Sequence, residues 1–300
     1  MTRTAKWVFG ILTALLIAFV VIVFSFMYYL LQGDENEEQG AGSNGTVALI
    51  ELKETIVSSD NTVRLFKKYR ENPSVKAIVF RVESPGGGVA ASQEIYEEVK
   101  KTRDGGKPVV VSMGSVAASG GYYVSCGASK IVANPGTVTG SIGVITQFIH
   151  VNGLMEKIGV SSTTIKSGKL KDAGSPMRPP TEEDKKYFQE MIDDVYGQFV
   201  GVVAAERKLD VDVVKSIADG RVYTGKRAYE LKLVDTLGTY EDAIALAGRL
   251  ANIKGVPATV RERKKERLSD ILFGTVKNEV TSLKNELVNQ PLLQYSLTQP

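Results

Sequence analysis

The sequence has little cysteine and little histidine, and each scarcity excludes a class of site. Cys126 is the only cysteine among the 300 residues, so no disulfide can form within the chain and no cysteine-rich metal site is possible. His150 is the only histidine, which excludes a two-histidine zinc site and leaves one candidate for any mechanism that needs a histidine base. We therefore predict a protein without a metal or cofactor.

Net charge is also low. Lysine and arginine total 37 against 34 aspartates and glutamates, for a net charge of +3, and the basic residues are dispersed among the acids. This pattern does not favour a nucleic-acid partner. With 43% hydrophobic residues, the composition suits one globular domain of ordinary size with appendages.

Residues 7–31, "WVFGILTALLIAFVVIVFSFMYYLL", contain no charged side chain. At about 1.5 Å per residue such a helix is about 37 Å long, which exceeds the ~30 Å hydrocarbon core of a bilayer. Trp7 at one end and Tyr28 and Tyr29 at the other suit the membrane interfaces. A cleaved signal peptide is the alternative, but the run is too long for one and no small-residue cleavage site follows. We predict a single-pass anchor that binds the lipid bilayer.

Charge on the two sides of this run predicts its orientation. Arg3 and Lys6 precede it, and an acidic stretch that begins at Asp34 follows it. Because positive residues stay on the cytoplasmic side, we expect a cytoplasmic N-terminus and a domain outside the cell membrane. The predicted divisions are an N-terminus and transmembrane anchor over 1–32, a flexible linker over 33–45, a globular domain over 46–260 and a charged amphipathic tail over 261–300.

Buried strands and helices alternate through the predicted domain. Continuous apolar runs predict strands, and the long segment from Thr181 to about Arg207, opened by the capping pattern "TEED", predicts a helix. Strands too apolar for one-sided burial argue for an α/β fold with a parallel sheet and right-handed crossovers. The predicted strands are "TVALIEL", "VKAIVFRV", "KPVVVSMG", "KIVANP", "GVITQFI" and "SSTTIKSG".

The tail begins with the charge run "RERKKER" and continues with apolar residues at three- and four-residue spacing. This spacing predicts an amphipathic helix that packs on the domain or on a neighbouring subunit, with membrane-surface binding as the alternative. The apolar positions are Leu268, Ile271, Leu272, Val276, Val280, Leu283 and Leu287. The final residues have no regular pattern, and we expect them to be mobile.

Ser119 lies in "VAASGGYYVSCGA", surrounded by the smallest side chains. The segment follows a predicted strand and opens a predicted helix, so Ser119 is expected near a strand-to-helix turn, where active sites of open α/β proteins gather. Small neighbours let another backbone, such as an extended peptide, approach within hydrogen-bonding distance. Close packing of helix on sheet is the alternative reason for small residues here.

A second turn, "SPGGG" over 84–88, follows the neighbouring strand. Its glycines can present backbone N–H groups to an anion. Phosphate is one such anion, although the turn lacks the lysine of a Walker loop and the G-x-G-x-x-G spacing. An oxyanion hole beside a serine nucleophile is the other interpretation, and an ordinary tight turn is the third.

A serine nucleophile needs a base. His150 follows a predicted apolar strand, where a packed or surface histidine is the simpler interpretation. The alternative is a lysine among Lys166, Lys169 and Lys171. An ordinary lysine has a pKa of about 10.4, and burial that lowers this value to about 7 corresponds to about 4 to 5 kcal/mol. The residues by themselves do not choose among the three lysines.

The segment "VVVSMGSVAASGGYYVSCGASKIVANPGTVTGSIGV" resembles the signal peptide peptidase A family of bacterial membrane-anchored serine peptidases, in its short single-domain form. The likeness extends over about 46–255 and includes "SPGGGV", "GKLKDAGSPMRPPTEED" and "GRVYTGKRAYELKLVDTLG". The resemblance implies a Clp protease/crotonase-like fold of repeated ββα units and a Ser–Lys dyad. By match to the family's motifs, Ser119 is the nucleophile, Lys171 is the general base, Ser141 supports the base, and Gly86 and Gly87 form the oxyanion hole.

Two positions depart from the family pattern. Lys232 stands where a glycine is usual; we expect this position to follow a helix end in a left-handed conformation, at a cost of about 1 kcal/mol. Leu170 replaces an aromatic residue before the base lysine and keeps that position apolar. Neither departure removes a catalytic group.

The resemblance implies a membrane-anchored serine endopeptidase that degrades remnant signal peptides and similar apolar peptides outside the cytoplasmic membrane. Ser119 and Lys171 lie on different loops, and in short members of the family they come from adjacent protomers, so we expect a homo-oligomeric ring with shared sites. The C-terminal tail is long enough for us to expect that it reaches a groove of its own ring. Crotonase-type acyl-CoA chemistry and a non-catalytic membrane-tethered scaffold are the alternatives.

Overall fold

A computed structural model describes residues 3–31, 45–262 and 293–296. The predicted linker 33–45 lies outside the described residues except for Gly45. The same holds for most of the predicted tail, of which 261–262 and 293–296 are described. The amphipathic helix expected in that tail therefore stays a prediction.

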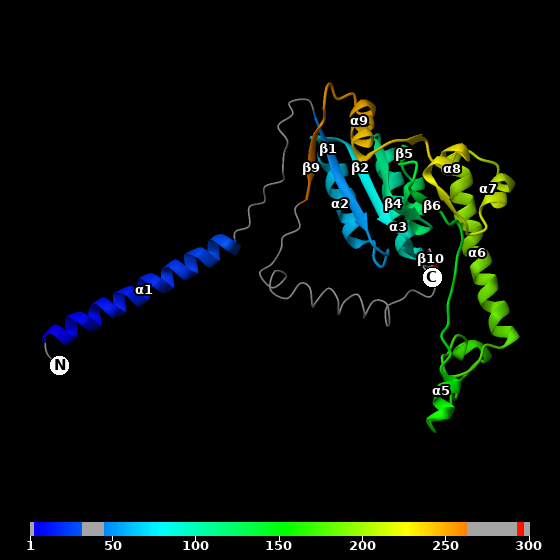
Figure 1. The fold of residues 1–300 in the computed structure, drawn as a ribbon, viewed down its shortest axis with the longest axis horizontal. Helices are drawn as coiled ribbons and strands as arrows, with labels where there is room; N and C mark the ends of the chain where they lie inside the picture. The colour runs from blue at the N-terminus through cyan, green and yellow to red at the C-terminus, as the bar shows by residue number, and fades with distance from the viewer. Residues whose placement is uncertain (1–2, 32–44, 263–292, 297–300) are drawn as a thin grey trace.

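A sheet of eight strands forms the centre of the described domain (Figure 1). Its main path runs in the order β7-β6-β4-β2-β1-β9, and β5 joins it by pairing with both β4 and β8. Every pairing in this sheet is parallel except β6 with β7, which confirms the predicted parallel α/β arrangement. The strands are β1 (Thr46–Lys53), β2 (Val75–Ser84), β4 (Val109–Ala118), β5 (Lys130–Ala133), β6 (Val138–Gly140), β7 (Val222–Thr224), β8 (Thr236–Leu237) and β9 (Ala258–Arg261).

Both faces of the sheet are covered, as the unbroken apolar runs require. On one face Ala48 and Ile50 of β1 belong to the larger core cluster with Phe66. On the other face Val47 and Leu49 belong to a smaller cluster. The alternation follows from the two-residue period of a strand. The covering helices are α2 (Asp60–Glu71), α3 (Val89–Asp104) and α4 (Gly120–Cys126) on the first face, with α9 (Tyr240–Leu250) on the second; α7 (Val211–Ile217) and α8 (Gly225–Glu230) complete the domain.

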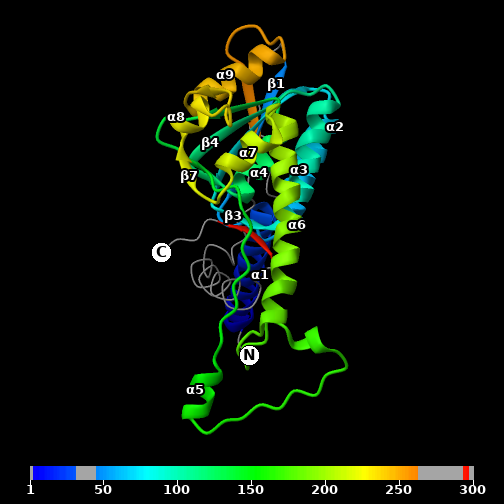
Figure 2. The same ribbon diagram turned by 90° about the vertical axis from the view of Figure 1, so that its right-hand side faces the viewer.

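The long helix α6 (Glu182–Arg207) begins as the sequence predicts. Thr181 and Asp184 form a reciprocal capping box, which satisfies two backbone N–H groups at the helix start. The second half of α6 is held by Phe199 and Val203, which are fully buried. The first half extends away from the domain beside the segment that carries α5 (Asn152–Lys157), so the two form a projecting arm (Figure 2).

Two of the predicted strands are wrong. The segment 161–168, "SSTTIKSG", is exposed and irregular, and "GVITQFI" contains only an isolated bridge at Ile145. Both lie where the chain leaves the sheet, so within the described residues no neighbouring strand pairs the N–H and C=O groups of 161–168. β-branched residues favour extended backbone, but a strand also needs a partner.

The conformation expected for Lys232 is confirmed. This residue lies just after α8 with φ of 61°, in the left-handed region that favours glycine. Its carbonyl accepts a hydrogen bond from Nε of Arg207 at 3.0 Å. The structure thus uses an unfavourable residue at a position whose backbone shape is set by its neighbours.

Near the N-terminus, α1 (Arg3–Leu31) is a helix of 29 residues. Within the described ranges, no helix meets the combined length and hydropathy requirement for crossing a membrane. The anchor predicted over 7–31 thus stays a prediction.

Candidate active site

Ser119 occupies the predicted strand-to-helix turn. β4 ends at Ala118 and α4 begins at Gly120, so Ser119 alone makes the turn, with φ of 52° and ψ of −115°. Its backbone N–H donates to the carbonyl of Gly140 at 2.8 Å, and its carbonyl accepts from the N–H of Tyr123 at 2.8 Å. A strained conformation of this kind persists only where surrounding bonds hold it. The hydroxyl is buried without a hydrogen-bond partner in the described part of the chain.

The glycine turn forms a short strand, β3 (Gly86–Gly88), beside Ser119. Ile56 holds it from one side, because its N–H donates to the carbonyl of Gly86 and its carbonyl accepts from the N–H of Gly88, both at 2.8 Å. A Cβ built on Gly87 would lie 2.2 Å from the carbonyl oxygen of Ile56. Glycine is therefore required there for space. Ser84 adds a further contact, since its Oγ accepts from the N–H of Gly86 at 3.2 Å.

A segment from the C-terminal end of the chain lies along β3. The strand β10 (Gln294–Ser296) pairs with β3 in antiparallel register, with Tyr295 opposite Gly87. On its other edge Gln294 exchanges two backbone hydrogen bonds with Ile145, of 3.0 and 3.1 Å. An extended backbone is thus bound on both edges, which is the arrangement used when a peptide adds a strand to a protein. The groove between β3 and Ile145 therefore holds an extended segment of the chain itself.

The carbonyl of Tyr295 lies at the centre of the glycine turn. A Cβ built on Gly86 would lie 2.0 Å from this carbonyl oxygen and 2.7 Å from the backbone nitrogen of Gly120. Gly86 has φ of 107°, a conformation that few other residues adopt. The missing side chain therefore leaves room for a peptide carbonyl beside Gly120, the residue that follows Ser119.

An aromatic pocket receives the side chain of Tyr295, which is fully buried. Its ring stacks on Tyr123 with centroids 5.0 Å apart and contacts Phe199 at 4.6 Å. Its hydroxyl donates to the carbonyl of Val195 at 3.3 Å. Burial raises the pKa of Tyr123 to about 12, so the pocket is neutral and apolar. Sequence reasoning missed this pocket, although Tyr122 and Tyr123, which follow the two glycines after Ser119, were a signal for it.

Ser141 lies next to Ser119 by strand pairing. Ala118 pairs with Gly140, so Ser119 and Ser141 are the first residues after the ends of two neighbouring strands. Ser141 is buried and, like Ser119, has a positive φ, of 50°. The structure thus brings Ser119, Ser141, Gly86 and Gly87 to one edge of the sheet.

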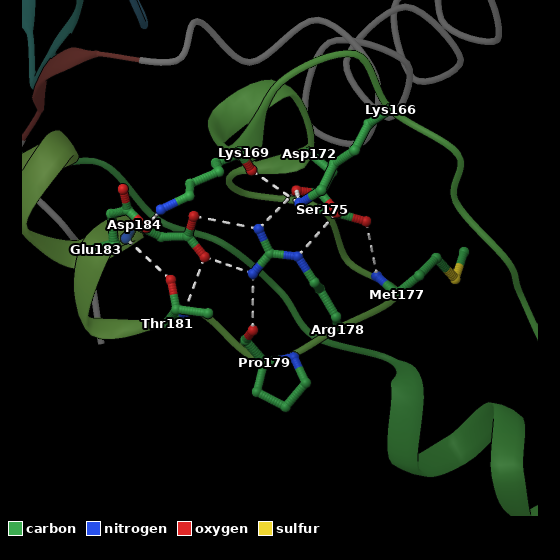
Figure 3. A network of polar contacts seen from close by, with 10 residues as sticks. All are labelled: Lys166, Lys169, Asp172, Ser175, Met177, Arg178, Pro179, Thr181, Glu183 and Asp184. Atoms are coloured by element: carbon green, nitrogen blue, oxygen red, sulfur yellow. Dashed lines mark hydrogen bonds and ion pairs between the residues drawn. The ribbon is translucent and has the colours of Figure 1, made fainter.

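Lys171 lies apart from this group, in the short helix η1 (Lys169–Asp172) on the projecting arm. Asp172, next to Lys171, is tied through Arg178 to Asp184 at the start of α6 (Figure 3). Val195 and Phe199, which contact Tyr295, lie 11 and 15 residues farther along that helix. At about 1.5 Å per residue the pocket is about 17 to 22 Å from Asp184 along α6. Within one chain, the structure does not bring Lys171 to Ser119.

The other candidate bases differ from Lys171 in their contacts. Lys166 pairs with Asp172 at 2.5 Å and Lys169 faces Glu183 at 4.0 Å. Lys171 is exposed and forms no ion pair with a carboxylate of the described residues. His150 is exposed on the arm and outside any strand. The single chain therefore leaves Lys171 available to another molecule.

Comparison with known proteins places the chain in a family. Residues 101–254 match the model of peptidase family S49. The chain belongs to this family. Three similar relatives are a Synechocystis sp. protein assigned as a protease, an Enterococcus faecium protein assigned as signal peptide peptidase SppA, and protease 4 of Salmonella typhi. Their names confirm the resemblance to the signal peptide peptidase A family of serine peptidases.

Sequence identity with these relatives is substantial, but the matches cover only part of each protein. It is 47% over 208 residues for the Synechocystis protein, 39% over 235 for the Enterococcus protein and 41% over 223 for the Salmonella protein. The matches cover 69%, 78% and 71% of this S49 peptidase, and 75%, 64% and 36% of the respective relatives. The region matched by the family model includes Ser119, Ser141 and Lys171, while the glycine turn at 86–88 precedes it.

Proposed function

We propose that this S49 peptidase hydrolyses extended peptides with Ser119 as the nucleophile. The main support is the position of a peptide backbone already in the groove, where the carbonyl of Tyr295 adjoins Gly86 and Gly120. Ser119 Oγ attacks the carbonyl carbon, and backbone N–H groups at Gly86, Gly87 and Gly120 stabilise the oxyanion. The C–N bond breaks, the new amine leaves with a proton, and water then hydrolyses the acyl-enzyme.

Lys171 removes the proton from Ser119, and it comes from an adjacent protomer. Two observations support this arrangement: the distance along α6, and the exposed side chain of Lys171, which forms no ion pair with a carboxylate of the described residues. Ser141, at the end of the neighbouring strand, forms a hydrogen bond with the side-chain amine of the incoming Lys171. Removal of water from an amine at the subunit contact favours its neutral form, which is the form that acts as a base.

The exposed apolar side chains of the arm support an oligomer. Ile149 is 79% exposed and Ile165 is 96% exposed, and Leu154 and Ile158 are each 61% exposed. Apolar residues gathered on one projecting element are typical of a subunit contact. A homo-oligomeric ring in which each arm reaches a neighbour covers these side chains and delivers each Lys171 to a different Ser119.

The substrates are apolar peptides, and remnant signal peptides released at the membrane are the physiological class. The neutral aromatic pocket around Tyr295 supports an apolar side chain before the cleaved bond. The uncharged run 7–31 supports a single-pass anchor with the N-terminus in the cytoplasm and the catalytic domain outside. The anchor holds the groove close to the bilayer from which such peptides leave.

A fluorophosphonate probe tests the nucleophile. The full chain in detergent should be labelled at Ser119. The Ser119→Ala variant should not be labelled, and its rate of peptide cleavage should fall at least about a thousandfold. Ser115→Ala, which removes an exposed hydroxyl from the same strand, is the matched control and should keep both. Labelling elsewhere, or none, would favour the acyl-CoA or scaffold alternative.

Mixed oligomers test the shared site. A Ser119→Ala chain supplies Lys171, and a Lys171→Ala chain supplies Ser119, so mixing the two should restore part of the cleavage that each lacks alone. A mixture no more active than the separate variants would show that both groups act within one protomer or that the base is another residue.

The C-terminal segment is itself a substrate of the groove. The C–N bond between Tyr295 and Ser296 is the one whose carbonyl adjoins Gly86 and Gly120, so its hydrolysis releases residues 296–300. Intact-mass spectrometry should find a chain that ends at Tyr295 in the active protein and the full chain in Ser119→Ala. A full-length active protein, or equal trimming in both, would contradict self-processing.

A further inference from the structure

The guanidinium of Arg178 bridges two acidic side chains on different elements of the arm. Towards η1 it donates to Asp172 through Nε at 3.0 Å and Nη2 at 2.8 Å. Towards α6 it contacts Asp184 through Nη1 and, at 3.1 Å, through Nη2. Figure 3 shows the guanidinium between the two carboxylates, with both forks in use. Paired contacts of this kind set orientation as well as distance.

The other end of η1 is held by Lys166. Its Nζ donates to the carbonyl of Lys169 at 2.8 Å and to Asp172 at 2.5 Å. Lys171 lies between these two anchored residues, and its own N–H donates to the carbonyl of Gly168 at 3.2 Å. The backbone that carries the proposed base is therefore fixed on both sides, while its side chain forms no ion pair with a carboxylate in the described part of the chain.

Asp184 connects this cluster to the rigid part of the molecule. It is 1% exposed, and its carboxylate also accepts from the N–H of Thr181 at 2.9 Å as part of the α6 capping box. The same helix contributes Phe199 and Val195 to the pocket around Tyr295. These contacts therefore fix the position of η1 relative to α6, the helix that also contributes to the proposed substrate groove.

We propose that Arg178 is a positioning residue for Lys171: by joining Asp172 to Asp184 it sets where the base is presented to the neighbouring protomer. This inference rests on the proposed role of Lys171. A general base must lie within hydrogen-bonding reach of the hydroxyl that it deprotonates, and a displacement of about 1 Å can lower a rate about a hundredfold. Peptide binding depends on β3 and Ile145, which Arg178 does not contact.

Steady-state kinetics of the full chain give the first test. Arg178→Gln should lower kcat about 10- to 100-fold with KM changed by less than about twofold, because the groove is intact while the base is displaced. Arg178→Lys keeps the charge and should lose less. Asp172→Asn, which removes the other side of the contact but keeps Arg178 on Asp184, provides a second variant if Arg178→Gln does not fold.

Arg227→Gln is the matched control, because it breaks a surface Arg–Glu contact on α8. It should leave kcat and KM unchanged. Wild-type kcat in both Arg178→Gln and Asp172→Asn would overturn the proposal, and so would an increase in KM alone.

Mixed oligomers give the decisive readout. Arg178→Gln placed on the Ser119→Ala chain, which supplies the base, should lower the restored activity by the same factor of about 10 to 100. The same substitution on the Lys171→Ala chain, which supplies the serine, should leave it intact. Equal loss in both placements would assign Arg178 to assembly and overturn positioning. An inactive parental mixture would instead refute the shared site, and the kinetics of Arg178→Gln would then decide the positioning role separately.

Discussion

At the scale of single residues, the site depends on side chains that are absent. A Cβ at Gly86, Gly87 or Gly120 would overlap a neighbouring atom, and at Gly86 that atom is the carbonyl oxygen of Tyr295. The remaining hydroxyl, on Ser119, is buried yet unpaired within the described chain, and a buried polar group without a partner is costly. An unpaired hydroxyl is consistent with the proposed role of Ser119 as a nucleophile, because strained and unsatisfied groups are tolerated at functional sites.

Gly86→Ala should lose cleavage and lower the melting temperature, because its φ of 107° disfavours a residue with a side chain. Its methyl group would take the place of the substrate carbonyl, 2.0 Å from the oxygen of Tyr295, so kcat/KM should fall at least about a hundredfold. Gly136→Ala is the control, since nothing lies within 4 Å of a Cβ built there. Measurement of peptide cleavage and thermal unfolding for both variants checks this. Near wild-type cleavage by Gly86→Ala would mean that the carbonyl binds elsewhere.

Cys126 should be inert in the folded protein. It is buried, and this burial raises the pKa of its thiol to about 12, so the reactive thiolate is scarce at pH 8. Iodoacetamide followed by intact-mass analysis should show no adduct in the native chain and one adduct in guanidinium. Rapid labelling of the native protein would show that α4 opens far more readily than its packing indicates.

At the scale of elements, the groove is formed by segments distant in sequence. β3 and Ile145 provide the two edges, and α4 and α6 provide the aromatic pocket. β10 occupies this groove with its backbone bonds satisfied, so it competes with any other peptide. Because β10 belongs to the same chain, its effective concentration is high.

Deletion of residues 293–300 should lower KM for an added peptide several-fold, because the competing segment is removed. Deletion of residues 297–300 keeps β10 and is the matched control; its KM should remain that of the full chain. Initial rates over a range of peptide concentrations distinguish the two. Equal KM values for both deletions would indicate that β10 does not block the groove in solution.

At the scale of the whole molecule, the arm and the domain divide the proposed reaction between them. In that proposal the domain binds the peptide and carries Ser119, and the arm carries the general base, Lys171, whose position Arg178 sets. Hydrogen bonds from Arg178 hold the pKa of Asp172 and of Asp184 well below the usual aspartate range. These bonds stabilise the folded arm wherever both carboxylates are ionised.

The sign of this coupling predicts an acid-dependent loss of stability. A carboxylate with a lowered folded pKa contributes stability above its unfolded pKa, about 3.9, and loses it as the pH falls through the folded value. The melting temperature of the wild type should therefore exceed that of Arg178→Gln between pH 5 and 8, and the difference should shrink below about pH 3. Thermal unfolding followed by circular dichroism at several pH values checks this. A difference that grows on acidification would contradict the assignment.

Much of the fold and part of the site were predictable, because local pattern carries them. Continuous apolar runs predicted the parallel strands, "TEED" predicted the start of α6, and small residues after a strand predicted the turn at Ser119. The position of Lys232 after a helix was also correct. The errors were "SSTTIKSG", which pairs with no strand of the described residues, and "GVITQFI", which makes only an isolated bridge at Ile145.

The sequence by itself determined the turn that presents Ser119, since backbone strain and small side chains act over a few neighbouring residues. It also carried the family motifs that singled out Lys171 from three similar lysines. Only the tertiary structure decided that Tyr295 fills an aromatic pocket beside β3. It also decided that Lys171, on the arm, lies far from Ser119 of the same chain. Contacts between residues about 100 or more positions apart depend on how whole elements pack, and no local period records that packing.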